Sequence, residues 1–408
     1  MRFVRVILKE DFGVGRTKRS SGKSLASAGT ALRLVRPTTN CVTVLDSLYE
    51  YRLWPAAFNQ VSCKEVQKLY RLSLFDWRSR PYKIPAASGT TISPFLRFMK
   101  TFPKHVTAAQ LHGCVAIGNF DGVHLGHAVM LTALRELAAE QGAQAVAVTF
   151  DPHPIAVLRP EFTPPILTTV EDRIELLRAA GADSVIVLPV TKTLLEMTAE
   201  QFFHAVIVDT FHAKGVVEGP NFRFGRDRKG DTAMLQGFCE RASLPCLIVR
   251  PVETNGQLIS SSRIRELLCS RSLRQAVELL GHPYRMTGVV RRGAGRGTGL
   301  GFPTANLAEV ATLLPAHGVY AGQATLDGKC YPVAVSVGPN PTFGEHREKV
   351  ECHIDGFRGD LYDKILQVDL LAEIRALQSF DSIERLVQQI REDVETTRRL
   401  QNQRLISS

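Results

Sequence analysis

The 408-residue sequence lacks any long apolar run, and none of its eight cysteines stands in a C-x-x-C pair. A membrane-spanning helix needs ~20 consecutive apolar residues, and charged residues interrupt the apolar stretches of this chain. The scattered cysteines fit neither a zinc-site spacing nor a disulfide framework. We therefore expect a soluble protein of the reducing cytoplasm, with no membrane partner.

An excess of positive charge is also missing from most of the chain, although the net charge is +10. Residues 1–98 contain 17 lysines and arginines against 6 aspartates and glutamates, and the remaining residues are nearly balanced. A nucleic-acid surface requires clustered basic residues, and the main part of the chain has none. We expect no nucleic-acid partner, and the sequence does not indicate an oligomeric state.

The N-terminal extension, residues 1–98, shows no sustained helical or strand periodicity. Its Arg- and Ser-rich, acid-poor start is typical of an organelle targeting segment and also of a reading frame extended upstream of the true start. Met99 stands shortly before the first predicted strand, and no clear cleavage pattern is present. These features favour a mis-assigned start, and we expect the extension to be poorly ordered.

A first domain, predicted over residues 99–281, alternates short apolar strands with amphipathic helices. Such alternation predicts a parallel sheet covered by helices on both faces. The predicted strands are CVAIGNF (114–120), AQAVAVTF (143–150), DSVIVLPV (183–190), KGVVEG (214–219) and PCLIVR (245–250).

A second domain, predicted over residues 282–408, has strand-like pieces broken by Gly, Pro and Asp-Gly turns. This pattern predicts an antiparallel β barrel or sandwich, closed by an amphipathic helix from Ser382 to about Leu400. The predicted strands are RMTGVVRR (285–292), GVYAGQATL (318–326), YPVAVSVG (331–338), KVECHID (349–355) and ILQVDLLAEI (365–374).

The stretch GNFDGVHLGH, residues 118–127, leaves a predicted strand through a glycine-rich turn and opens a helix. Free N–H groups and the positive end of the helix dipole favour an anion there. His124 and His127 share one helix face, and Gly126 leaves room for a phosphate. The two imidazoles would stabilise charge on a phosphate oxygen. Alternatively, they are a surface pair or half of a metal site; the absence of H-E-x-x-H excludes a zinc protease.

Two further polar stretches follow later strands, at the edge where ligands bind in open α/β sheets. In ISSSRIRE (259–266), Ser261 and Ser262 are either helix caps or, with Arg265, a second phosphate clamp. The loop GPNFRFGRDRKGD (219–231) carries three arginines that form either a mobile basic lid or a solvated loop: Arg223, Arg226 and Arg228.

GNFDGVHLGH, GPNFRFG and ISSSRIR together resemble the FMN adenylyltransferase module of prokaryotic-type bifunctional FAD synthetases, which are H-x-G-H nucleotidyltransferases. The resemblance implies a Rossmann-like domain in which the FMN phosphate attacks the α-phosphorus of ATP and expels pyrophosphate. It implies ATP-phosphate contacts from His124 and His127, and an FMN contact from Asn221. It places Gly118, Phe120 and Asp121 in the nucleotide pocket, and Ser261, Ser262 and Arg265 in the second clamp.

The glycine-rich segment GAGRGTGLGFPTANL, residues 293–307, matches neither a Walker loop nor G-x-G-x-x-G. It forms either a flexible flap around polyphosphate or a plain hairpin. In an extended chain Thr304 and Asn306 point to one face, about 7 Å apart. Their oxygens suit a Mg²⁺ that keeps its waters and the nucleotide phosphates.

The stretch VECHID alternates in the same way and places Glu351, His353 and Asp355 on one face. Glu351 is then either a general base for a hydroxyl or part of the polar outer face of an edge strand. LGFPTANL, SVGPNPTFG (336–344), VECHID and GDLYDK (359–364) resemble the riboflavin kinase module, a small β barrel with a C-terminal helix. The resemblance implies that Thr304 and Asn306 bind Mg²⁺ and ATP while Glu351 activates the ribityl 5′-hydroxyl.

The combined resemblance predicts a bifunctional enzyme that converts riboflavin to FMN and then FAD with ATP and Mg²⁺, and whose partners are small-molecule substrates. One alternative is a riboflavin kinase fused to a nucleotidyltransferase of other specificity, such as a cytidylyltransferase; the GPNFRFG loop argues against it. Another is a flavin-binding regulatory protein with inactive sites, which disagrees with the intact His124, His127, Thr304, Asn306 and Glu351.

Overall fold

The computed structural model describes residues 110–254, 256–293, 295–340, 342 and 348–407. The predicted N-terminal extension lies outside these residues, as does part of the SVGPNPTFG stretch. Among the helices of the described part, none combines the length and apolar character needed to cross a membrane.

The first part of the described chain contains a five-stranded sheet in the order β3-β2-β1-β4-β5, and all four strand pairings are parallel. Its strands are β1 (Cys114–Ile117), β2 (Ala145–Asp151), β3 (Ser184–Pro189), β4 (Gly215–Glu218) and β5 (Cys246–Ile248). Its helices are α4 (Leu125–Glu140), α5 (Pro154–Leu158), α6 (Val170–Ala179), α7 (Lys192–Glu196), α8 (Ala199–Phe202) and α9 (Thr232–Arg241). The predicted Rossmann-like architecture is confirmed.

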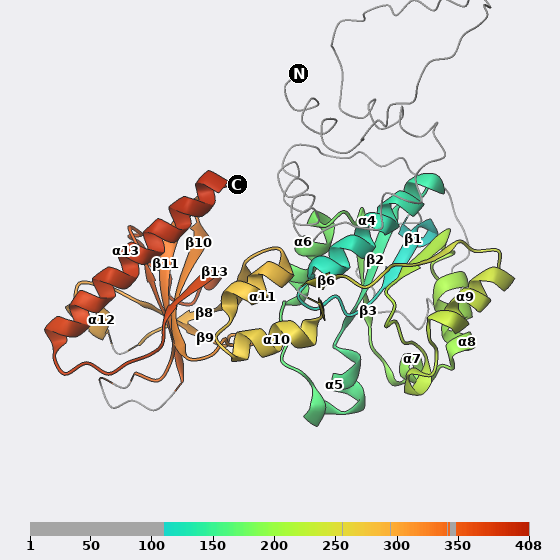
Figure 1. Ribbon diagram of the computed structural model, residues 1–408. Helices are drawn as coiled ribbons and strands as arrows, with labels where there is room; N and C mark the ends of the chain where they lie inside the picture. Colours follow the sequence, from blue (N-terminus) through green and yellow to red (C-terminus); the bar gives the residue numbers. More distant parts are fainter. Residues whose placement is uncertain (1–109, 255, 294, 341, 343–347, 408) are drawn as a thin grey trace, which may run out of the picture. The chain divides into compact units, whose positions relative to one another are not determined.

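Helices cover both faces of this sheet, because successive strand residues alternate between two cores. Val115 and Ile117 belong to a core formed with α8, α9 and the segment between them. Cys114 and Ala116 belong to a core formed with α4 and α6, whose apolar stripes include Leu131 and Leu177. Figure 1 shows α4 and α6 on one side of the sheet, and α8 and α9 on the other.

The segment MTAEQFFHAVIVDTF, residues 197–211, is one of the amphipathic stretches between strands, but it does not form a single regular α helix. A capping box at Thr198 starts the short α8, and a π-helical segment, Phe203–Val208, continues it. The wider turn still buries the apolar side chains Phe203, Val206 and Ile207. Apolar periodicity reports which residues are buried and does not distinguish an α turn from a π turn.

A small hairpin and two helices precede the barrel: β6 (Glu253–Thr254), β7 (Gln257–Leu258), α10 (Ser261–Cys269) and α11 (Leu273–Leu280). The buried side chains of α10 and α11, including Ile264, Leu268 and Leu280, belong to the same apolar core as barrel residues such as Tyr284. The Tyr284 hydroxyl donates to the Leu313 carbonyl, which provides this buried side chain with a polar partner.

The second part is a closed barrel in the order β10-β11-β12-β9-β8-β13, with every pairing antiparallel. Its elements are β8 (Tyr284–Arg291), α12 (Arg296–Gly299), β9 (Ala305–Ala308), β10 (Gly318–Leu326), β11 (Lys329–Gly338), β12 (Lys349–Ile354), β13 (Ile365–Arg375) and α13 (Ile383–Ser407). The expectation of a β barrel followed by a helix is confirmed, and closure leaves no free sheet edge.

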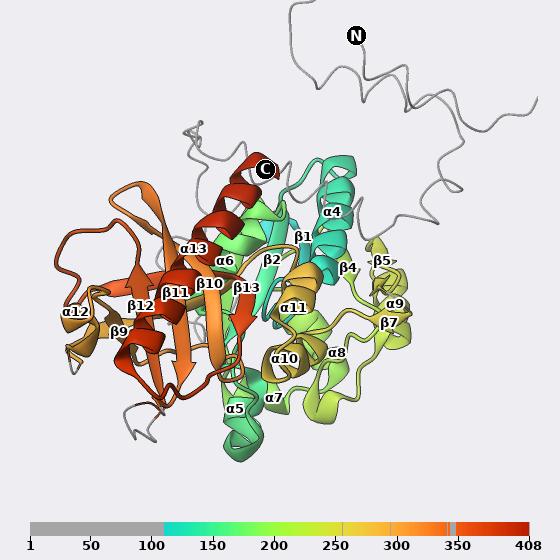
Figure 2. The ribbon, with the colours of Figure 1, turned by 60° about the vertical axis from the view of Figure 1, so that its left-hand side comes forward.

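The C-terminal helix α13 packs on the barrel strands β10, β11 and β13 (Figure 2). An ion pair anchors it: Arg375 Nη2 lies 2.8 Å from Asp393 Oδ2, and the side chains are 19% and 4% exposed. Arg375 Nε donates a second hydrogen bond, of 3.0 Å, to Asp393 Oδ1. This two-point contact holds the helix in register with the end of β13.

Arg375→Met should lower the free energy of unfolding by about 3 kcal/mol, because it leaves the buried Asp393 charge without its partner. Urea unfolding followed by circular dichroism measures this change. Arg385→Met on α13 is the control, since the ion pair of Arg385 with Asp381 is exposed and should contribute little. Equal destabilisation by both variants would contradict the assigned role of Arg375.

Candidate active sites

The paired histidines lie where the central strand β1 ends and α4 begins. His124 is the N-cap residue of α4, and His127 is in its first turn. Their rings stack with centroids 3.7 Å apart and an interplanar angle of 14°. The ring of Phe120 meets His127 edge-on, with centroids 5.1 Å apart. The structure therefore brings together three of the residues predicted for the nucleotide pocket.

Burial keeps both imidazoles neutral. Desolvation lowers the pKa of His124 to about 3 and holds the pKa of His127 well below its usual value. Within the described residues, the buried Nδ1 atoms of both rings have no hydrogen-bond partner. Buried polar atoms normally have a partner, so these two nitrogens indicate a ligand with polar atoms of its own.

Gly126 stands between the two histidines and contacts the first ring. A Cβ atom at this position would lie 3.1 Å from the Cε1 and Nδ1 atoms of His124. A larger residue would therefore press on the imidazole, in addition to closing the space expected for a phosphate. The role of Gly126 in nucleotide binding stays a prediction.

Asp121, which is 3% exposed, accepts several hydrogen bonds in the turn that leads to His124. Its carboxylate accepts from the backbone N–H groups of Leu167 and Thr168, and from the Thr168 hydroxyl. It also accepts a short hydrogen bond from Arg265 Nη2. Asp121 and Arg265, which were predicted to contact nucleotide, are thus joined to each other, and Arg265 Nε donates to the Pro165 carbonyl.

The three serines at the start of α10 differ in their hydrogen bonds. Ser260, one residue before the pair considered in the sequence, is the N-cap, and its hydroxyl accepts from the Arg263 N–H. The Ser261 hydroxyl donates to the Asp121 carbonyl over 2.8 Å. This hydrogen bond joins α10 to residues 118–127, which we call the histidine turn. Ser262 is exposed. The helix-cap interpretation of Ser261 and Ser262 is therefore wrong, while their place in a phosphate clamp stays a prediction.

The GPNFRFG loop follows β4 and closes on itself. Phe224 and Gly230 form an isolated β-bridge. Arg223 Nη1 lies 3.4 Å from Asp231 Oδ2. Asn221, the predicted FMN contact, is exposed at the start of the loop, where a ligand can reach it. Its contact with FMN stays a prediction, as does the motion of the arginines.

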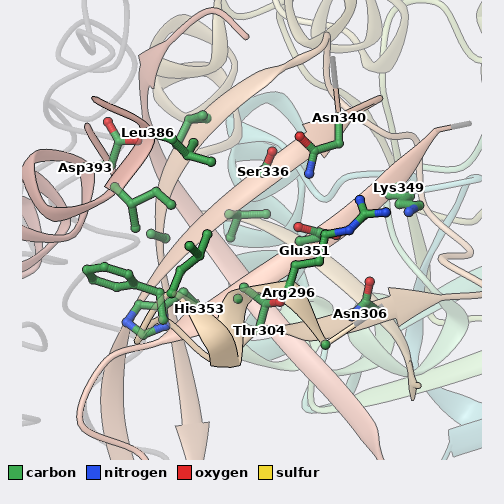
Figure 3. Close-up of a pocket in the computed structure, with 18 of the residues that line it drawn as sticks. Arg296, Thr304, Asn306, Ser336, Asn340, Lys349, Glu351, His353, Leu386 and Asp393 are labelled. Atoms are coloured by element: carbon green, nitrogen blue, oxygen red, sulfur yellow. The ribbon is translucent and has the colours of Figure 1, made fainter. Parts of the chain in front are cut away.

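A second pocket lies on the barrel, beneath α13 and beside the glycine-rich segment. Figure 3 shows Thr304, Asn306 and Glu351 on one side and Leu386 and Asp393 of α13 on the other. Glu351 on β12 lies directly opposite Asn306 on β9 in the strand pairing. The predicted alternation of β12 is present, since Val350, Cys352 and Ile354 are buried while Glu351 and His353 are partly exposed.

The glycine-rich segment packs closely against the predicted metal ligand. A Cβ atom at Gly293 would lie 2.2 Å from Asn306 Nδ2, so a larger residue at this position would displace the carboxamide. His353 supports the same region, because its Nδ1 hydrogen-bonds the Pro303 carbonyl over 2.9 Å. Thr304 and Asn306 contribute neutral oxygens, and such oxygen donors fit a hard cation such as Mg²⁺. The Glu351 carboxylate lines the same pocket.

Three buried polar side chains beside the histidine site were missed by the sequence interpretation. His282 Nε2 is 3.0 Å from the Gly122 carbonyl, and Glu218 accepts from the Ile117 N–H over 2.7 Å. Desolvation raises the pKa of Glu218 well above its usual value. Arg173 on α6 contacts the end of β2. A charged residue in a short apolar strand was the available signal for Glu218; nothing local marked the others.

The folds and pockets define a class: a nucleotidyltransferase-type parallel sheet followed in the same chain by a kinase-type β barrel. Family models agree, since FAD synthetase matches residues 107–263 and riboflavin kinase matches residues 280–401. The chain belongs to the bifunctional riboflavin kinase/FMN adenylyltransferase family.

Curated relatives carry that bifunctional designation. The Pseudomonas fluorescens relative is 35% identical over 298 residues, which are 72% of this chain and 96% of the relative. The Escherichia coli K12 relative is 32% identical, with coverage of 72% and 95%. The Bacillus subtilis relative is 30% identical, with coverage of 72% and 94%.

A solved structure also has a similar fold. The crystal structure of a macrolide-efflux protein from Streptococcus pneumoniae matches with a TM-score of 0.63 and 31% sequence identity. The match covers 70% of this chain and 94% of that one. It therefore supports the fold, a parallel sheet followed by a barrel, over nearly the whole of the solved chain, while its efflux designation concerns that protein alone.

Proposed function

We propose that this chain catalyses two ATP-dependent reactions, the phosphorylation of riboflavin to FMN and the adenylylation of FMN to FAD. The kinase reaction is assigned to residues 282–408 and the adenylylation to residues 99–281. The observation that carries the proposal is the presence of two chemically different sites: a stacked, neutral histidine pair at a helix start, and a carboxylate paired with Asn306 on a barrel. The matches to both family models support it.

In the kinase site, Glu351 acts as general base. The ribityl 5′-oxygen attacks the γ-phosphorus of ATP, its proton passes to the Glu351 carboxylate, and ADP leaves. Thr304 and Asn306 would hold Mg²⁺, which neutralises charge on the phosphates when bound. The paired strands β9 and β12 keep Asn306 and Glu351 in register, and Thr304 directly precedes β9.

In the adenylylation site, no covalent intermediate with the protein is needed. A phosphate oxygen of FMN attacks the α-phosphorus of ATP, and pyrophosphate leaves. His124 and His127, being neutral, donate hydrogen bonds to phosphate oxygens as charge builds on them, without having to lose a proton first. Ser262 and Arg265 would complete the phosphate clamp, and Asn221 would contact FMN.

Product analysis tests the proposal. Riboflavin, ATP and Mg²⁺ incubated with the full chain should yield FMN first and FAD later, as separated by HPLC. A kinase fused to a nucleotidyltransferase of other specificity would stop at FMN, and an inactive flavin-binding protein would form neither product. Neither alternative is favoured by the family matches.

Asn306→Ala should raise the Mg²⁺ concentration required for half-maximal FMN formation by about tenfold or more, because it removes one oxygen ligand. A Mg²⁺ titration of riboflavin phosphorylation measures the change. Adenylylation of supplied FMN by the same variant is the internal control and should keep its wild-type Mg²⁺ dependence. An unchanged requirement in the kinase reaction would remove Asn306 from the metal site.

A further inference from the structure

Arg173, near the start of α6, is a buried cation with 6% exposure. Its Nη1 donates to the Thr149 hydroxyl over 3.2 Å and to the Phe150 carbonyl over 3.1 Å. Its Nη2 donates to the Thr168 carbonyl over 3.3 Å and lies 3.8 Å from Asp121 Oδ1. One side chain therefore joins the carboxyl end of β2 to the turn that precedes α6.

These contacts converge on the histidine turn. The Thr149 hydroxyl, which accepts from Arg173, donates to the Asn119 carbonyl over 3.0 Å. Asp121, two residues further along that turn, also binds Thr168. Arg173 thus supports, through Thr149 and Asp121, the backbone that leads into His124.

Around Arg173, two positively charged side chains face one buried carboxylate. The buried carboxylate of Asp121 already accepts from Arg265, so two guanidinium groups share it. Asp151, at the exposed end of β2, is a further acidic neighbour. Burial lowers the pKa of Arg173, but a guanidinium stays charged in proteins. A buried charge of this kind costs free energy unless it is compensated.

Three buried nitrogens in this region have no partner within the part of the chain that the structure describes: Arg173 Nε and the Nδ1 atoms of His124 and His127. Unsatisfied buried polar atoms are uncommon, and each lowers stability. Their presence beside two guanidinium groups that share one buried carboxylate indicates that this end of the site is completed by an anion.

We propose that Arg173 is a positioning residue for adenylylation, which braces the turn carrying His124 and His127 and supplies a fixed positive charge to the triphosphate end of the site. The proposal rests on the assignment of adenylylation to this domain. The adjacent residue on α6, Asp172, has a different role, because its carboxylate accepts from Arg285 and Gln367 of the barrel strands.

The positive charge of Arg173 also disfavours the protonation of His127. His127 faces three sources that lower its pKa: desolvation first, then His124 and Arg173. His124 in turn faces His282, and Asp121 faces Arg173 and Arg265. Removing the Arg173 charge removes one of the influences that disfavour protonated His127, so the pKa of His127 should rise.

The test compares Arg173→Met and Arg173→Lys in the full chain, with Asp172→Asn as the matched control. Arg173→Met should lower kcat/KM for adenylylation of FMN by about 100-fold. The acidic limb of its pH profile should move to higher pH. Arg173→Lys keeps the charge, so its acidic limb should stay at the wild-type position while part of the rate returns. Riboflavin phosphorylation by the same preparations should be unchanged, which shows that the variants are folded.

Asp172→Asn should retain adenylylation within a few-fold of wild type. An equal loss in Asp172→Asn and Arg173→Met, or a loss without movement of the acidic limb, would show that Arg173 acts only as a structural brace; the absence of the charge role would overturn the proposal. If Arg173→Met does not fold, Arg173→Lys decides: an acidic limb displaced from wild type contradicts the proposal. Wild-type protein that does not adenylylate FMN would instead refute the assigned function.

Discussion

Replacing Glu351 by alanine abolishes FMN formation from riboflavin, with an expected loss of about 10³-fold, the contribution typical of a positioned general base. The same variant should still convert supplied FMN to FAD. The reason is geometric, since Glu351 lies opposite Asn306 and lines the barrel pocket, whereas His124 and His127 lie at the start of α4. Separate assays with riboflavin and with FMN measure the two outcomes.

The substitution should leave the fold intact. The core side of β12 consists of Val350, Cys352 and Ile354, and Glu351 points away from it. Asp355→Asn is the matched control: this carboxylate follows the same strand but pairs with Arg398 of α13, so FMN formation should persist. Loss of both reactions in folded Glu351→Ala protein, or retention of FMN formation, would refute the assigned base.

Replacing His127 by alanine should have the opposite effect. Adenylylation of FMN should fall by about 10²- to 10³-fold, the cost of removing one preorganised donor from a charge-stabilising site. FMN formation from riboflavin should continue at the wild-type rate. The riboflavin reaction would then accumulate FMN and stop there, which HPLC resolves directly.

The matched control for this variant is His212→Ala. His212 stacks on His112 with ring centroids 5.0 Å apart, outside the histidine turn, and should leave both reactions unchanged. A His127→Ala protein that lost both activities while remaining folded would show that the two reactions do not use separate sites. Unchanged adenylylation would show that the stacked pair has another purpose.

The sheet and the barrel were predictable because each element has a strong local signal. Alternation in KVECHID, with Val350 and Cys352 on the buried face, correctly predicted both the strand and the side on which Glu351 lies. The apolar stripe of α4, which includes Leu131 and Leu134, is an equally local signal for the first helix. Such patterns depend on burial, which acts on each segment separately.

The polar partnerships were not predictable, because they join residues far apart in the chain. Arg265 contacts Asp121 across 144 sequence positions, and the sequence around either residue does not predict this contact. Ser260 caps α10 in a run of three serines that sequence alone cannot rank. In the sequence, Arg173 looks like an exposed arginine of an amphipathic helix, whereas in the structure it is buried. Site composition therefore follows from motifs, whereas the hydrogen bonds that orient it follow from tertiary structure.

The most direct test is a crystal structure of the full chain with a non-hydrolysable ATP analogue, Mg²⁺ and riboflavin. We predict nucleotide in both halves: one triphosphate against His124 and His127 at the start of α4, and another beside Thr304, Asn306 and Glu351 on the barrel. Nucleotide bound away from either set of residues would contradict the two-site account.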